Sequence, residues 1–133
     1  MSYSVFTYGT LSFPDVLEVV VGRRLPGTEA ALDGYRCARF VGGQFPGLVA
    51  SPDDRVLGVV YRDVDRATLA RLDDFEGDLY VRRLLEVTID GAPLAAFTYL
   101  VAARFHARFA GNWDRDWFAR HQKSAFIARL TRR

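Results

Sequence analysis

The stretch from Leu25 to Val64 constrains the fold most, because turn-forming residues interrupt it every few positions. These interruptions are Gly27, Asp33-Gly34, Gly42-Gly43, Pro46-Gly47 and Ser51-Pro52-Asp53-Asp54. Glycine and proline at this density end regular elements, and β-branched residues dominate the short apolar runs between them, such as Val56–Tyr61. The pattern predicts several short strands packed into this part of the chain.

The segment before this stretch is typical of a strand followed by a helix. Ser4–Tyr8 is rich in β-branched and aromatic residues and is predicted to form a strand that ends at Gly9. A helix should follow almost at once, because Ser12 and Asp15 have the spacing of a capping pair. Apolar residues then recur at helical spacing until Gly22, where we expect the helix to end.

The second half of the chain is predicted to form a helix and a β-hairpin. Asp65 should cap a helix that runs to about Phe75. Val81–Ile89 alternates as a strand, Asp90-Gly91 is a hairpin turn signal, and Ala95–Val101 should return as the partner strand.

One amphipathic helix over about Asp114–Leu130 is predicted to close the chain. Its apolar side carries residues four apart, namely Trp113, Trp117, His121 and Ala125, widened by Phe118, Phe126 and Ile127. On this face a packed histidine is the favoured interpretation of His121. No repeat or linker divides the sequence, so we expect one domain over residues 1–133, with residues 113–133 as an appended helical tail.

Composition limits the function classes. Eighteen Lys and Arg against 16 Asp and Glu leave a formal charge of +2, which is too close to balance to predict a nucleic-acid or membrane partner. Cys37 is the only cysteine, and no signal segment or membrane-length apolar run is present, so we expect a cytoplasmic protein. Two histidines and one cysteine do not make a zinc site, and we expect neither a metal nor a cofactor.

Glu76 and the turn Tyr8-Gly9-Thr10-Leu11 are the first candidates for chemistry. Glycine allows close backbone approach to a ligand, and amides at a helix start can bind an anion, although such a turn more often only connects two elements. Glu76 follows Leu72 by four residues and Leu69 by seven, which places its carboxylate on an apolar helix face. It is either a solvated helix end or a base with a raised pKa.

Tyr99, Asp73 and Asp74 are further polar residues of interest. Tyr99 should point inward, as a core tyrosine or as a site residue. Asp73 and Asp74 are adjacent to one another, and we interpret both as solvated acids on the helix surface.

Six short motifs occur in a fixed order along the first hundred residues. They are Val5–Leu11, Phe45–Leu48, Val56–Tyr61, Leu72–Gly77, Tyr80 with Arg82, and Tyr99-Leu100. Each motif is unspecific alone, but in this order they resemble the γ-glutamylcyclotransferase superfamily, in particular its AIG2-like branch. The C-terminal segment with Trp113 and Trp117 is similar to the last helix of AIG2-like members.

The resemblance implies an α+β fold, a small mixed β-barrel with flanking helices. It also implies an enzyme that converts a γ-glutamyl amide into 5-oxoproline and a free amine without a cofactor. Glu76 matches the catalytic glutamate of the family. The family's substrate-binding positions correspond to Tyr8, Gly9, Thr10, Leu11, Tyr80 and Tyr99.

Several alternatives remain open at the level of sequence. The amine that leaves can be an amino acid or dipeptide, or an amine such as the lysine of a γ-glutamyl-ε-lysine isopeptide, and glutathione ranks lower. The same pocket can serve a binding module that retains a small ligand without turnover. Trp113, Trp117 and the basic tail also suggest a docking surface for a partner or for a second copy through the C-terminal helix.

Overall fold

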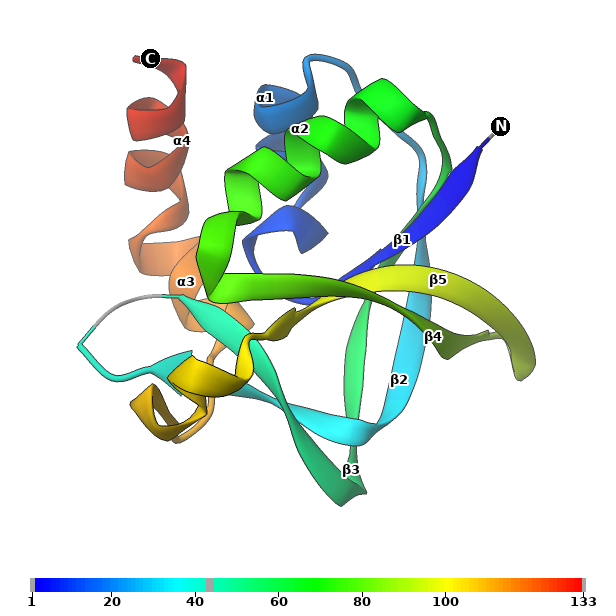
Figure 1. The fold of residues 1–133 in the computed structure, drawn as a ribbon. Helices are drawn as coiled ribbons and strands as arrows, with labels where there is room; N and C mark the ends of the chain where they lie inside the picture. The colour runs from blue at the N-terminus through cyan, green and yellow to red at the C-terminus, as the bar shows by residue number, and fades with distance from the viewer. Residues whose placement is uncertain (1, 43–44, 133) are drawn as a thin grey trace.

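The computed structural model describes residues 2–42 and 45–132 (Figure 1). Its strands are β1 (Tyr3–Thr7), β2 (Gly27–Phe40), β3 (Pro46–Val64), β4 (Tyr80–Ile89), β5 (Ala92–Val101) and β6 (Phe109–Ala110). Its α-helices are α1 (Pro14–Val21), α2 (Arg66–Glu76), α3 (Arg115–His121) and α4 (Lys123–Thr131). Short 3-10 helices are η1 (Thr10–Ser12), η2 (Gly77–Leu79) and η3 (Ala103–Arg108).

Two long strands, β2 and β3, occupy the stretch where several short strands were expected, so that prediction was wrong. They pair antiparallel from Gly27↔Tyr61 to Arg39↔Pro46, and the register shifts once, between Asp33 and Tyr35. Gly34 lies at this shift with a φ of +85°. An irregularity of this kind bends the paired strands without ending their hydrogen bonding. β2 and β3 therefore continue through Gly34 instead of ending there. Gly43, in another expected turn, lies outside the described residues.

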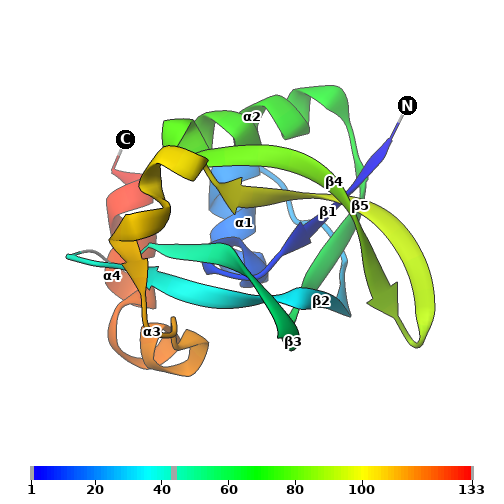
Figure 2. The ribbon, with the colours of Figure 1, turned by 60° about the horizontal axis from the view of Figure 1, so that its bottom comes forward.

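The strand pairings form a circuit. β1 pairs with β3, β3 with β2, β2 with β4, β4 with β5, and β5 returns to β1. The joins β2–β4 and β5–β1 each rest on a single residue pair, Ala31↔Thr88 and Val5↔Phe97. The six-stranded sheet is therefore strongly curled (Figure 2), and the mixed α+β class expected from the sequence is confirmed.

Local signals placed α2 and the β4–β5 hairpin correctly. Asp65 is the N-cap of α2, and its carboxylate accepts a hydrogen bond from the Thr68 amide at 2.7 Å. β4 and β5 pair without interruption, and the turn between them has positive φ at Asp90 and Gly91. This is the backbone conformation for which Asp-Gly turns are favoured.

The first helix begins later than the capping pair predicted. Phe13, not Ser12, is the N-cap of α1, and Pro14 occupies the first helical position. The Ser12 hydroxyl donates instead to the Gly9 carbonyl, which closes the short helix η1. Gly22 ends α1 in the left-handed region, as expected.

The predicted C-terminal helix is two helices, α3 and α4, which meet at Gln122. Gln122 has φ −132° and ψ −21°, outside the helical region. Because α3 begins only at Arg115, Trp113 lies before the helix, and the expected stripe does not form. Trp117 and His121 are exposed, with their rings 5.1 Å apart, so the prediction of a packed His121 was wrong.

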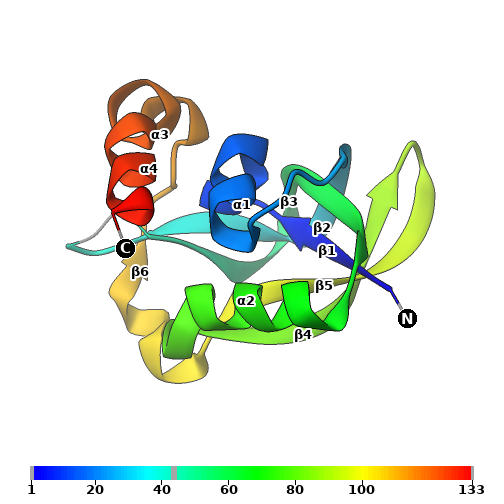
Figure 3. The ribbon, with the colours of Figure 1, turned by 90° about the horizontal axis from the view of Figure 1, so that it is seen from above.

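The main core lies between the curled sheet and the helices. Phe118 and Trp113 belong to it, so the C-terminal segment contributes directly to the core that α1 and α2 cover. α1, α2 and α4 lie together at one end of the sheet (Figures 1 and 3). Within residues 2–42 and 45–132, no helix is long and apolar enough to cross a membrane.

Candidate functional site

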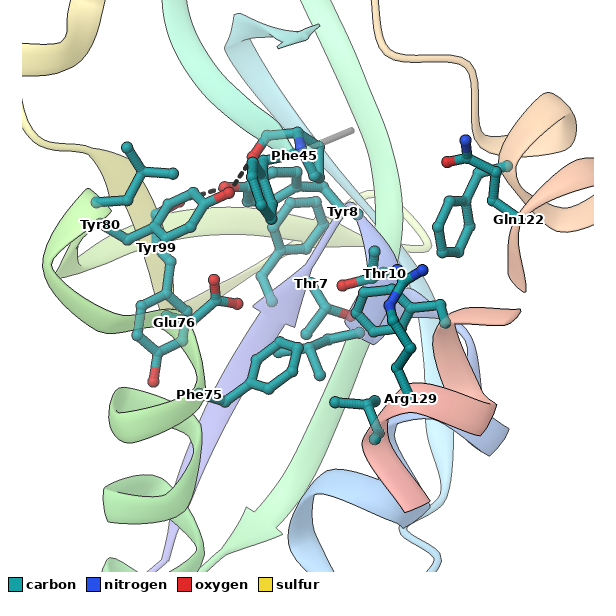
Figure 4. A pocket seen from close by; sticks show the side chains of 18 of the residues that line it. Thr7, Tyr8, Thr10, Phe45, Phe75, Glu76, Tyr80, Tyr99, Gln122 and Arg129 are labelled. Carbon is teal, nitrogen blue, oxygen red and sulfur yellow. Dashed lines mark hydrogen bonds between the residues drawn. The ribbon is translucent and has the colours of Figure 1, made fainter. Parts of the chain in front are cut away.

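A cavity of about 620 Å³ lies where α2 and α4 approach the end of β1 (Figure 4). All seven residues predicted for the site line it, namely Tyr8, Gly9, Thr10, Leu11, Glu76, Tyr80 and Tyr99. They come from four separate parts of the chain. The curled sheet and α2 therefore assemble in one place what the sequence holds far apart.

The turn after β1 forms one wall of the cavity. A Cβ atom on Gly9 would lie 2.3 Å from Cγ of Pro46, so only glycine allows β3 to approach the turn this closely. The amides at the start of η1, on Thr10 and Leu11, have no carbonyl acceptor within that helix. They can therefore serve as hydrogen-bond donors to a ligand in the cavity.

Glu76 is the last residue of α2, and its carboxylate points into the cavity (Figure 4). It shares the buried face of α2 with Leu69 and Leu72, as its spacing predicted. Burial raises the pKa of the Glu76 carboxyl from 4.5 to about 8, and burial is the only cause of this shift. In the described part of the chain no side chain forms an ion pair or hydrogen bond with this carboxylate, so it is available to exchange a proton.

Three tyrosines complete the inner wall. The Tyr8 hydroxyl donates to the backbone carbonyl of Tyr99 at 2.6 Å, and the Tyr80 hydroxyl donates to the Pro46 carbonyl. Burial raises the pKa of each of the three hydroxyls well above its usual value. These side chains therefore stay neutral and act as a fixed, largely apolar wall.

Asp73 is bound by its neighbours and is not the solvated acid that was predicted. Its Oδ1 accepts a hydrogen bond from the Tyr99 hydroxyl at 2.7 Å and lies 3.3 Å from Nε of Arg82. The Arg82 guanidinium in turn lies 4.7 Å from the ring centroid of Phe97. Asp74, in contrast, is exposed as expected.

The helix spacing held a signal for Asp73. It follows Leu69 by four residues and precedes Glu76 by three, so it lies on the same side of α2 as both. We infer that Asp73 and Arg82 fix the orientation of Tyr99.

α4 supplies a wall that sequence analysis missed. Phe126, Arg129 and Leu130 of α4 line the cavity at the i, i+3, i+4 spacing of one helix face, and Gln122, the residue before α4, lines it too. The Phe126 ring contacts Phe75 of α2 edge to face, with 6.3 Å between centroids. This spacing is visible in the sequence. It indicates a cavity wall only when α4 is recognised as a separate helix that begins after Gln122.

The remaining nucleophilic and metal-binding candidates lie elsewhere. Neither His106 nor His121 lines this cavity, and among residues 2–42 and 45–132 no group of three or more His, Cys, Asp or Glu could hold a metal ion. Burial raises the pKa of the Cys37 thiol to about 12, so Cys37 stays protonated. Glu76 is thus the group in the cavity that is best placed for proton transfer.

Comparison with protein families decides the affiliation of the chain. Residues 5–117 match the family described as "Gamma-glutamyl cyclotransferase, AIG2-like". The chain belongs to this family. The AIG2-like resemblance seen in the sequence motifs is thereby confirmed, and it supports an enzyme of the γ-glutamylcyclotransferase kind.

Several AIG2-like relatives are known from Arabidopsis thaliana. "AIG2-like protein C" is 29% identical over 95% of this chain and 74% of its own length, and "Protein AIG2 C" is 32% identical over 90% and 74%. An Arabidopsis thaliana protein of known solution structure superposes with a TM-score of 0.76, at 28% identity over 99% of this chain and 81% of its own. A structure named "Gamma-glutamyl cyclotransferase" has a TM-score of 0.65 at 16% identity, covering 98% and 87%, and shares the fold.

Proposed function

We propose that this AIG2-like protein converts a γ-glutamyl amide into 5-oxoproline and a free amine, with Glu76 as general base and then general acid. The observation that carries the proposal is the Glu76 carboxylate, whose pKa of about 8 suits proton exchange near neutral pH. It stands beside the turn and tyrosines that correspond to the family's substrate-binding positions. The family affiliation supplies the reaction class.

The reaction needs one proton acceptor that later becomes a donor. Glu76 takes a proton from the substrate α-ammonium group, and the freed nitrogen attacks the γ-carbonyl carbon of the same glutamyl group. A new C–N bond forms, and the carbonyl oxygen becomes an oxyanion. Glu76 then returns the proton to the amide nitrogen, the original C–N bond breaks and the carbonyl reforms. The ring nitrogen loses its second proton to the departing amine, which leaves as an ammonium ion.

The cavity walls supply the orientation that ring closure requires. The substrate must fold so that its own nitrogen faces its γ-carbonyl, and holding this conformer can lower the barrier by on the order of 7–11 kcal/mol in the best cases. The Thr10 and Leu11 amides are placed to donate hydrogen bonds to the oxyanion or to the glutamyl carboxylate. The fixed rings of Tyr8 and Tyr99 restrict the glutamyl group from the opposite side.

The deciding experiment measures 5-oxoproline release from γ-glutamyl amino acids, γ-glutamyl-ε-lysine and glutathione. Glu76→Gln keeps the shape of the side chain but cannot exchange the proton, so we expect kcat to fall by about 10²- to 10⁴-fold. Glu86→Gln is the matched control, because Glu86 is exposed on β4 and lies outside the cavity. Undiminished turnover by a folded Glu76→Gln protein would refute the proposed role.

The pH profile gives a second test of the same role. The base must be ionised, so kcat/KM should rise with pH up to about 8 and then level, until other groups titrate. A profile that is flat between pH 6 and pH 8 would contradict Glu76 as the base. Tight binding of these compounds with no product from any of them would instead favour a binding module.

A further inference from the structure

α4 brings a basic side chain to the wall opposite Glu76. Among the described residues that line the cavity, the charged ones are Glu76, Asp78 and Arg129, so Arg129 is the single cation. Figure 4 shows Glu76 and Arg129 extending from opposite sides, one from α2 and the other from α4. Arg129 is exposed, whereas Glu76 is partly buried, so the cation stands at the outer part of the cavity.

Arg129 has no acidic partner in the described part of the chain. Its guanidinium packs 5.7 Å from the ring centroid of Phe126, whereas Arg23, Arg24 and Arg82 pair with carboxylates. No ion pair joins Arg129 to Glu76 among the described residues, and Figure 4 shows the two side chains on opposite sides of the cavity. The guanidinium is therefore free to bind an anionic group of a ligand, and its planar donors suit a carboxylate.

The depth of the two groups indicates which part of the substrate each meets. The γ-glutamyl group is common to all substrates of the proposed reaction, and its nitrogen and carbonyl must lie beside Glu76. In the proposed reaction the leaving amine extends beyond the scissile bond and away from Glu76, and the exposed Arg129 lies in the outer part of the cavity. A cation there meets the variable part of the substrate, not the part that reacts.

The position of α4 is fixed by contacts that do not involve Arg129. Lys123 Nζ lies 2.9 Å from a carboxylate oxygen of Asp15, which ties the start of α4 to α1. Phe126 packs against Phe75 and Phe118, with ring centroids 6.3 and 5.6 Å apart. Because these contacts hold the helix, the Arg129 side chain is not needed to dock it.

We propose that Arg129 binds a carboxylate on the departing amine, so that the protein prefers γ-glutamyl amino acids and peptides to γ-glutamylamines without a carboxylate near the scissile bond. This inference rests on the proposed function. Asp78 of η2 also lines the cavity, and its negative charge disfavours a carboxylate beside it, so Arg129 is the favourable charged contact for such a group. Arg129 thus selects the leaving group, while Glu76 acts on the bond that breaks.

The test compares two substrates that differ in one group. γ-Glutamyl-alanine and γ-glutamylethylamide share the glutamyl part and the amide, and only the first carries a carboxylate on the amine. Arg129→Gln should lower kcat/KM for γ-glutamyl-alanine about tenfold to a hundredfold, mainly through KM, and leave γ-glutamylethylamide unchanged. Arg129→Lys should restore part of the difference, because it keeps the charge but loses the planar donors.

Arg132→Gln is the matched control. Arg132 follows α4, is exposed, and supplies a cation at the same helix end without lining the cavity. If the Arg129 charge only stabilises the helix end, Arg132→Gln should have the same effect on both substrates as Arg129→Gln. An equal loss for both substrates in Arg129→Gln, or no loss, would overturn the inference.

Binding measurements separate this inference from the proposed reaction. In the Glu76→Gln background, calorimetry with both compounds should show that Arg129→Gln weakens γ-glutamyl-alanine selectively. If Arg129→Gln weakens binding of γ-glutamyl-alanine selectively, but the wild-type protein releases no 5-oxoproline from either compound, the proposed reaction is refuted and the carboxylate site is retained. If the wild-type protein turns over both compounds and Arg129→Gln changes neither, the reaction is supported and the carboxylate site is refuted. If neither compound binds, the reaction and the carboxylate site are both refuted.

Discussion

Burial of the Glu76 carboxyl links the stability of the protein to pH. The folded protein holds this proton with a pKa of about 8, against a usual value of 4.5, so the folded state binds it more tightly than the unfolded chain. The stabilising contribution is therefore complete below about pH 4.5 and is lost as the pH rises through 8. One pKa unit corresponds to about 1.4 kcal/mol.

We expect the Glu76→Gln protein to lose less stability than the wild type between pH 5 and pH 8. Between pH 5 and pH 8, the free energy of unfolding of the wild type should fall relative to that of Glu76→Gln by a few kcal/mol, with an upper limit of about 4 kcal/mol. Urea denaturation of both proteins at the two pH values measures it. The lowered pKa values of Asp15 and Asp65 act in both proteins and in a lower pH range, so they cancel in the comparison. Parallel curves for the two proteins would contradict the raised pKa.

The Tyr99 hydroxyl donates a hydrogen bond to the Asp73 carboxylate and so links the cavity wall to α2. Tyr99→Phe removes the donor to Asp73 and leaves that carboxylate with Arg82 alone, so we expect a loss of about 1–2 kcal/mol in the free energy of unfolding. Urea denaturation measures the loss. Tyr35→Phe is the control, because no described residue bonds to the half-buried Tyr35 hydroxyl, and its cost should be close to zero.

At the scale of elements, α2 depends on its cap. Asp65→Ala removes the acceptor of the Thr68 amide and should lower the free energy of unfolding by about 1 kcal/mol, within a range of roughly 0.5–2. Chemical denaturation detects a change of this size. Arg66→Ala, at the next position and exposed, should change stability by less than half as much, and equal losses would contradict a specific capping role.

Elements were predictable where their signals are local. The cap at Asp65 and the turn at Asp90-Gly91 depend on neighbouring residues, and both were placed correctly. The glycines and prolines of β2 and β3 failed as boundary signals, because pairing over 14 and 19 residues absorbs an irregularity that would end a shorter strand.

The site was predictable to the same extent. Glu76 and the turn at Gly9 were found from helix spacing and sequence motif, and all the predicted residues line one cavity. Asp73 and the α4 residues were missed, because their roles arise from packing between elements. No pattern in α2 alone indicates that Tyr99 of β5 will contact Asp73.

For the molecule as a whole, the curled sheet depends on close approach between strands. A Cβ atom on Gly58 would lie 2.2 Å from the Thr7 carbonyl oxygen and 2.7 Å from the Phe6 ring. Gly58→Ala should therefore push β1 away from β3 and cost about 3 kcal/mol or more in the free energy of unfolding. Circular dichroism followed during thermal and urea unfolding measures this loss.

Gly91→Ala provides the comparison for Gly58. Gly91 has a φ of +79° and open space around its Cα, so alanine there should cost only the backbone strain, about 1–2 kcal/mol. A similar cost at both positions would show that the strands can separate without penalty.

Gln122 separates α3 from α4, and the residues before and after it contribute differently to the cavity. The proposed base and the proposed substrate-binding residues lie between Tyr8 and Tyr99, and the family match ends at residue 117, before α4 begins. α4 lines the cavity with three side chains and is held to α1 and α2 by contacts that leave Arg129 aside. Under the proposed reaction, substitutions in the last turns of the chain would therefore change which amine is released and would leave the groups around Glu76 in place.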